Sequence, residues 1–144
     1  MKSLKTTFVI TLALMLSTGF KSEAQRLFDA VPEQVIFKTN VIENLFSQNA
    51  GSAVDIRFNQ NFRVTGIVKS NQKVYSNLQT VVVSVSNYSN AKLFVSRTID
   101  ENNAVKYVGR LIGRGAQDGF ELKADLAGNN NSLKKINLKE MIVE

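Results

Sequence analysis

Residues 78–86 read Leu-Gln-Thr-Val-Val-Val-Ser-Val-Ser and carry the clearest secondary-structure signal in the chain. Four valines and one threonine in nine residues predict a β-strand. Val81, Val83 and Val85 would face one side of a sheet, because successive side chains of a strand alternate between its faces. An uncharged run this rich in valine would promote aggregation at an open edge. We therefore expect it inside a sheet, with a strand on each side.

The sequence beyond Ser52 has the two-residue period of half-buried strands. Residues 54–58 and 62–68 flank Asn59-Gln60-Asn61 and predict a hairpin with Phe58 and Phe62 on its buried face. Polar segments separate the remaining predicted strands. The longest polar segment is a connection over 70–77. Including a short strand before the hairpin, the other predicted strands are 34–38, 91–99, 105–112, 119–124 and 132–138.

The strands 105–112 and 119–124 allow a specific register to be predicted. If Leu111 lies opposite Phe120, then Gly109 lies opposite Leu122 and Tyr107 opposite Ala124, so large side chains face small ones on the inner side. On the outer side the same register sets oppositely charged residues against each other, namely Arg110 against Glu121 and Lys106 against Asp125. A one-residue slip would lose both sets of pairs, which favours this register. The last strand, with three lysines at 134, 135 and 139, would suit a charged sheet edge.

One short helix is predicted before the hairpin. Asn40 can cap its start, Glu43 stands at the third helical position, and Gly51 follows its expected end. Its apolar residues recur at helical spacing and are Val41, Ile42, Leu45 and Phe46. We expect this helix to close one end of a sheet or barrel, with a partner-binding helix as the alternative. The fold class is therefore all-β, an antiparallel meander of about seven to eight strands forming a small barrel or sandwich, preceded by one short α-helix.

The first 24 residues have the organisation of a signal peptide. Lys2 and Lys5 precede an apolar run over 8–16, and Ser22-Glu23-Ala24 places small residues where a signal peptidase reads them. We expect cleavage after Ala24, with Gly19 and Gln25 as alternative sites. A retained membrane anchor is a weaker interpretation, because the apolar run is far shorter than the roughly 20 residues that span a bilayer. The prediction is a secreted or periplasmic protein with a single β-rich domain over 25–144.

The 144-residue chain contains no cysteine and no histidine. These absences exclude disulfides, thiolate chemistry, the commonest general base and the usual zinc ligands. We therefore expect no catalytic activity, no cofactor and no metal site. Carboxylates remain, and Asp118, Glu121 and Asp125 lie close in sequence, so a carboxylate-dependent hydrolase is kept as a less favoured alternative. Cleavage of the leader would remove three lysines and one glutamate, which lowers the net charge from +6 to +4.

Five residues are candidates for ligand binding. Arg110 and Arg114 lie in a glycine-rich segment that either binds an anion or turns the chain, and its spacing matches no phosphate-binding motif. Arg57 and Arg63 would oppose each other across the first hairpin, which requires an acidic neighbour, a shifted register or an external anion. Tyr107, on the inner side of the same strand as Arg110, completes the set.

These features predict an exported, non-catalytic binding or structural module of the cell envelope or extracellular space. Its partner would be a protein, a glycan or an envelope component rather than a nucleic acid, and the processed protein would not span a membrane. The alternative is a barrel-type carrier of a small apolar ligand, in which Gly66 and Gly109 leave internal space.

Overall fold

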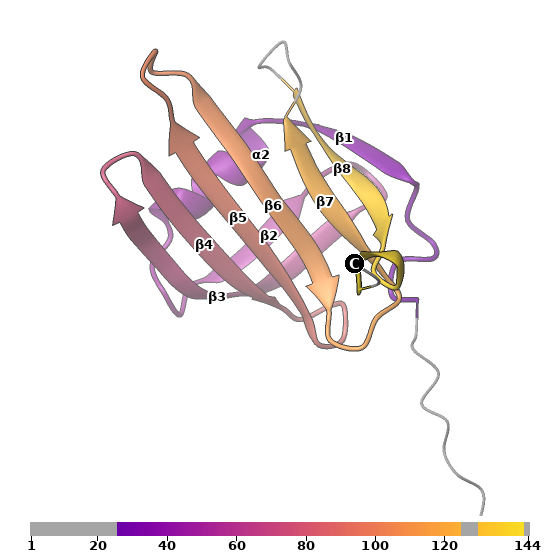
Figure 1. The fold of residues 1–144 in the computed structure, drawn as a ribbon. Helices are drawn as coiled ribbons and strands as arrows, with labels where there is room; N and C mark the ends of the chain where they lie inside the picture. Colours follow the sequence, from indigo (N-terminus) through magenta and orange to yellow (C-terminus); the bar gives the residue numbers. More distant parts are fainter. Residues whose placement is uncertain (1–25, 125–129, 143–144) are drawn as a thin grey trace, which may run out of the picture.

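Eight antiparallel strands form one sheet that curls into a half-barrel (Figure 1). The structure is a computed structural model that describes residues 26–124 and 130–142. The predicted leader and residues 125–129 lie outside this description. The all-β prediction is confirmed, and the arrangement is neither a sandwich nor a closed barrel, because β1 and β2 are the two ends of the sheet.

The strands follow the chain as a meander, and the order across the sheet is β1-β8-β7-β6-β5-β4-β3-β2. Each strand from β2 to β7 pairs with the next one along the chain, while β1 pairs with β8. The strands are β1 (Gln34–Lys38), β2 (Ala53–Arg57), β3 (Arg63–Tyr75), β4 (Leu78–Val85), β5 (Ala91–Ile99), β6 (Val105–Gly113), β7 (Asp118–Ala124) and β8 (Asn130–Asn137). The helical segments are α2 (Asn40–Glu43) and the 3-10 helices η2 (Asn44–Ser47) and η3 (Glu140–Ile142).

The central predictions about the sheet are confirmed. Strand β4 lies between β3 and β5, and its alternate valines, beginning with Val81, are buried. In the β6–β7 pair Leu111 lies opposite Phe120, Gly109 opposite Leu122 and Arg110 opposite Glu121, as the charge and size pattern predicts. Because side chains alternate, this register sends the apolar set to the concave face and the charged set to the convex face.

Two predictions about strands are wrong. The predicted polar connection over 70–77 is mostly strand, because β3 continues to Tyr75 and pairs with the first half of β4. A register shift between Val68 and Ser70 precedes this polar half, where backbone pairing rather than apolar burial maintains the strand. Strand β8 is also not a sheet edge, because β1 covers its outer side.

The helix is shorter than its apolar pattern predicts. A single α-turn, α2, passes directly into the 3-10 turn η2, and Thr39 rather than Asn40 occupies the N-cap position, without a side-chain capping bond. The buried side chains of these two turns are Ile42, Leu45 and Phe46. Side-chain amides of the sheet hold them in place, since Asn71 Nδ2 and Gln79 Nε2 donate to the Phe46 carbonyl at 3.0 and 2.9 Å. The two turns therefore cover the concave face near one end, as Figure 1 shows.

Aromatic rings fill the middle of the concave face. Phe62 is fully buried and packs against Phe58, Phe120 and Tyr88 with ring centroids 5.3–5.9 Å apart. Phe28, from the segment before β1, joins this cluster and lies 5.3 Å from Phe120. The core is therefore assembled from residues far apart in the sequence.

Gly66 and Gly109 do not leave internal space for a ligand. A Cβ atom at Gly66 would meet the backbone oxygen of Ser84, and one at Gly109 would meet the backbone oxygen of Phe94. Both glycines permit a close approach of neighbouring strands. The expectation that they open a cavity is therefore wrong.

A buried carboxylate holds the segment before β1 on the sheet. Asp118, at the start of β7, accepts hydrogen bonds from the backbone N–H groups of Leu27 at 2.7 Å and Phe28 at 3.0 Å. Lys135 on β8 donates to the carbonyl of Val31 at 2.7 Å. These bonds fix the position from which Phe28 enters the core.

Candidate functional site

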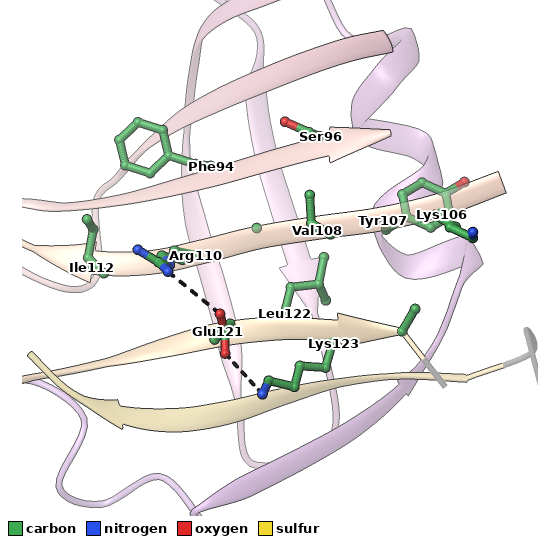
Figure 2. A pocket seen from close by; sticks show the side chains of 12 residues that line it. Phe94, Ser96, Lys106, Tyr107, Val108, Arg110, Ile112, Glu121, Leu122 and Lys123 are labelled. Atoms are coloured by element: carbon green, nitrogen blue, oxygen red, sulfur yellow. Dashed lines mark ion pairs between the residues drawn. The ribbon is translucent and has the colours of Figure 1, made fainter. Parts of the chain in front are cut away.

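The convex face of β5, β6 and β7 carries an open groove, which we call the convex groove (Figure 2). It consists of a depression of about 630 Å³ and an adjoining one of about 400 Å³. The half-buried side chains of Phe94 and Ile112 line both depressions and form their common floor. Alternation places these residues here, since Leu93, Val95 and Leu111 beside them point into the core.

Cationic side chains surround this apolar floor, and Glu121 is the one acidic residue among those that line it. Arg110 and Lys123 share the Glu121 carboxylate, with N–O distances of 3.7 and 3.2 Å, and Figure 2 marks both pairs. Lys106 lies 3.4 Å from Asp100. The pKa of Asp100 is lowered, first by the backbone N–H of Ala104 and then in part by Lys106. The charges of Lys106, Arg110 and Lys123 are thus largely neutralised by neighbouring carboxylates.

The other end of the groove keeps its positive charge. Lys92 and Arg114 line the smaller depression together with Ser84 and Asn90, and neither cation forms an ion pair with any residue in 26–124 or 130–142. The Arg114 N–H donates to the Asn90 carbonyl at 3.2 Å, which ties the β6–β7 loop to the β4–β5 turn. Two exposed cations and two polar side chains are therefore held together beside Phe94.

Three of the five predicted residues line this groove, with Tyr107 and Arg110 at the larger depression and Arg114 at the smaller one. Arg57 and Arg63 lie opposite each other on β2 and β3, as the hairpin predicts. Of the three explanations for that arrangement, the acidic neighbour is present, because Arg63 Nε donates to Asp55 Oδ1 at 2.6 Å. This hydrogen bond also lowers the pKa of Asp55. Arg57 has no ion pair within the part of the chain that the structure describes.

Although Tyr107 is among the residues that line the larger depression, its side chain lies on the other side of the sheet from Arg110. Its side chain is 4% exposed and its ring packs on Phe46 at 5.8 Å between centroids. Burial, with a smaller contribution from the charge of Glu43, raises the pKa of Tyr107. The guanidinium of Arg97 lies over the Phe46 ring, 4.9 Å from its centroid. The same guanidinium donates a hydrogen bond to Gln79 Oε1 at 2.7 Å. This cluster joins η2 to the sheet and does not include the four arginines singled out from the sequence.

The sequence analysis missed Lys92, Phe94 and Ile112. The structure pairs Lys92 with Ile112 and Phe94 with Arg110 across β5 and β6. The outer pairs of β5 and β6 contain no pair of opposite charges, so the charge rule that specifies the register of β6 and β7 gives no signal here.

Asp118 and Glu121, which lie close in the sequence, do not face each other across a cleft. Asp118 points into the core toward backbone N–H groups, while Glu121 lies on the convex face with two cations. Asp125, which the sequence pairs with Lys106, lies outside the described residues. Within 26–124 and 130–142 no three acidic side chains gather as a group able to hold a metal ion.

No helix among the described residues is both long and apolar enough to cross a membrane. Comparisons with protein-family models, with curated proteins and with solved structures find no match for this chain. The functional argument for the convex groove therefore rests on the geometry and charge of its own residues.

Proposed function

We propose that this protein is an exported, non-catalytic binding module that binds an anionic glycan of the cell envelope or extracellular space through the convex groove. The observation that carries the proposal is the charge of the groove lining. Five cationic side chains and a single carboxylate, Glu121, surround the floor formed by Phe94 and Ile112. The five cationic residues are Lys92, Lys106, Arg110, Arg114 and Lys123.

The end of the groove at Lys92 and Arg114 supports an anionic ligand. A carboxylate or sulfate bound there would receive charge-assisted hydrogen bonds without displacing an existing ion pair of the described chain. Ser84 and Asn90 add neutral polar groups within the same depression. The positive net charge of the chain also favours approach of an anionic polymer.

The shape of the groove supports an extended ligand. Small-molecule sites are usually deep clefts that enclose most of the ligand, whereas these residues stand on the outer surface of three neighbouring strands (Figure 2). The half-buried ring of Phe94 offers an apolar surface beside the cations, which suits the apolar face of a sugar ring. A chain of acidic sugars can lie along the apolar floor and place an acidic group at the end of the groove beside Lys92 and Arg114.

The two alternatives have less support. A carrier of an apolar ligand needs internal space, but Phe28, Phe62 and Phe120 are fully buried in the concave face. A hydrolase needs two carboxylates across a cleft, and Asp118 and Glu121 lie on opposite faces of β7. Neither alternative explains the cations of the convex groove.

Export rests on the leader sequence, with cleavage proposed after Ala24. That site lies just before Leu27 and Phe28, whose N–H groups bind Asp118, so processing would leave the folded contacts intact. N-terminal sequencing of the protein recovered from the periplasm or medium tests this point. We expect Gln25 as the first residue, and recovery of the uncleaved chain in the cytoplasm would contradict export.

Binding is tested with immobilised heparin, polygalacturonate, neutral dextran and poly-glutamate. We expect binding to the two anionic polysaccharides, weakening with salt as charges are screened, and none to dextran. The double variant Lys92→Gln/Arg114→Gln should bind about tenfold more weakly or worse, since each lost charge-assisted hydrogen bond contributes roughly 1 kcal/mol.

Arg57→Gln is the matched control, because it removes an exposed cation of β2 that lies outside the groove. It should bind as the parent does. Equal losses in the control and the double variant would show only general charge attraction and would refute the groove. Binding to poly-glutamate alone would point instead to an acidic protein.

A further inference from the structure

The two edges of the sheet differ in chemistry. On the convex side of β2 the exposed residues are Ala53, Asp55 and Arg57, so this edge carries both charges. On the convex side of β1 the central exposed residue is Ile36, which is 62% exposed. Charged side chains on an edge strand discourage pairing with another molecule, whereas a large apolar side chain promotes it. No other described strand pairs with the outer side of β1.

The hydrogen-bond pattern of β1 also leaves alternate backbone groups pointing outward, where a further strand could pair with them. The Lys135 N–H donates to the Glu33 carbonyl at 2.8 Å, and Gln34 lies opposite Lys134. In an antiparallel pair hydrogen-bonded and non-hydrogen-bonded positions alternate, so Val35 and Phe37 direct their backbone groups to β8. Residues Gln34, Ile36 and Lys38 therefore direct their N–H and C=O groups away from the sheet.

We propose that β1 pairs antiparallel with β1 of a second copy of this chain, about a two-fold axis at Ile36. In this register Ile36 faces Ile36 of the second copy, and Gln34 faces Lys38. These are the positions whose backbone groups point outward, so each can form a hydrogen-bonded pair with its counterpart. A two-fold axis makes such an interface self-complementary and closed at two copies.

Neighbouring registers fit less well. Moving the axis to Val35 sets Pro32 opposite Lys38, and proline has no N–H to donate. Moving the axis to Phe37 sets Gln34 opposite Asn40, where α2 has already begun. The axis at Ile36 keeps all five residues of β1 paired.

The opposite edge does not offer the same interface. Pairing β2 with itself about its central residue would set two Asp55 carboxylates against each other, and like charges directly opposite destabilise a strand pair. Asp55 is in addition held by Arg63 within its own chain. The second copy therefore fits β1 and not β2.

The interface is small, because one five-residue strand from each copy contributes. Stable complexes usually bury roughly 1,200–2,000 Å², so we expect reversible association with a dissociation constant on the order of 10–100 μM. The two-fold axis would be perpendicular to the joined sheet, so both convex faces would lie on one side. If the proposed function holds, a long anionic polymer would then meet two grooves at once.

Sedimentation velocity of the protein recovered after expression of the full chain, without any glycan, tests the proposal between about 1 and 300 μM. We expect a concentration-dependent shift from monomer to dimer. Ile36→Lys should raise the dissociation constant at least tenfold, because it sets two cations face to face at the axis. Ile67→Lys is the matched control, since Ile67 is a 42%-exposed isoleucine on β3, which is paired on both sides.

A cross-linking measurement covers the case in which Ile36→Lys fails to fold. The chain has no cysteine, so Ile36→Cys introduces a single thiol. Mild oxidation should link most of this variant into disulfide dimers, and much less of Ile67→Cys. A monomer at every concentration, a dimer equally sensitive to both lysine variants, or equal cross-linking of both cysteine variants would overturn the proposal. Loss of glycan binding alone would not affect it.

Discussion

The concave and convex faces of this sheet are made by the same strands and have opposite chemistry. On β6, Tyr107 and Leu111 are buried in the core, while Val108 and Arg110 between them lie on the outer surface. The concave face packs rings and aliphatic side chains from β1 to β8, and the convex face collects cations around Phe94. The two-residue period thus separates the residues that stabilise the fold from those available for binding.

The largest expected difference in stability is between alanine substitutions of two phenylalanines, one on each face of the sheet. Phe62→Ala should lower the free energy of unfolding by about 3–5 kcal/mol, because it removes a fully buried ring that packs with four others. Phe94→Ala should cost about 1 kcal/mol, since the ring is only half-buried, but it should weaken binding to the anionic polysaccharide. Urea denaturation and the binding assay measure the two effects. A larger stability loss in Phe94→Ala would contradict the division of roles between the faces.

The next comparison uses two acidic residues of β7. Asp118→Asn should lower stability by about 1.5–3 kcal/mol, because the buried carboxylate accepts two backbone hydrogen bonds. Glu121→Gln should change stability by less than about 1 kcal/mol, because its ion pairs are partly exposed. Denaturation midpoints at pH 7 give both values. Equal losses would mean that Asp118 does not hold the segment before β1.

Adjacent residues of β6 give a third comparison. Gly109→Ala should destabilise by about 1–3 kcal/mol, because the new Cβ would press against the backbone of β5. Val108→Ala, at a side chain 57% exposed, should stay within about 0.5 kcal/mol of the parent. Thermal unfolding followed by circular dichroism separates the two. Full tolerance of alanine at Gly109 would show that β5 and β6 lie farther apart than the structure has them.

The smallest effect concerns pH at the convex side of β2 and β3. Arg63 lowers the pKa of Asp55, so their pair stabilises the folded state above the ordinary pKa of an aspartate and loses that contribution as the pH falls through the lowered value. Arg63→Gln should therefore raise the pKa of Asp55 and flatten the acid limb of the stability curve slightly. Carbon-detected NMR titration of the carboxyl group measures the shift. An unchanged pKa would exclude the ion pair in solution.

The sequence predicts most of the sheet because local and cross-strand patterns agree there. The alternation in 54–68, the valine run of β4 and the charge pairs between β6 and β7 each specify a strand or its register. The second half of β3 was missed, since its polar residues carry no burial pattern and depend on pairing with β4. Strand β1 was found, but no local pattern shows that it covers β8 rather than β2.

The candidate site was only half predictable. Arg110 and Arg114 were both found through the glycine-rich segment in which they lie. Lys92 and Phe94 have no local signal of function and become part of a site only when β5 is aligned with β6. Tyr107 was grouped with the arginines, although alternation places its side chain on the other face. Closeness in the sequence therefore predicts poorly which residues share a site, whereas the cross-strand register shows which side chains lie side by side on one face.

The most direct test of the central claim is an NMR titration of ¹⁵N-labelled protein with a heparin hexasaccharide. We expect the largest amide shifts at Lys92, Phe94, Ile112 and Arg114, with saturation, and small shifts along β2. Shifts that are largest around Arg57, or none at millimolar oligosaccharide, would contradict the assignment of binding to the convex groove.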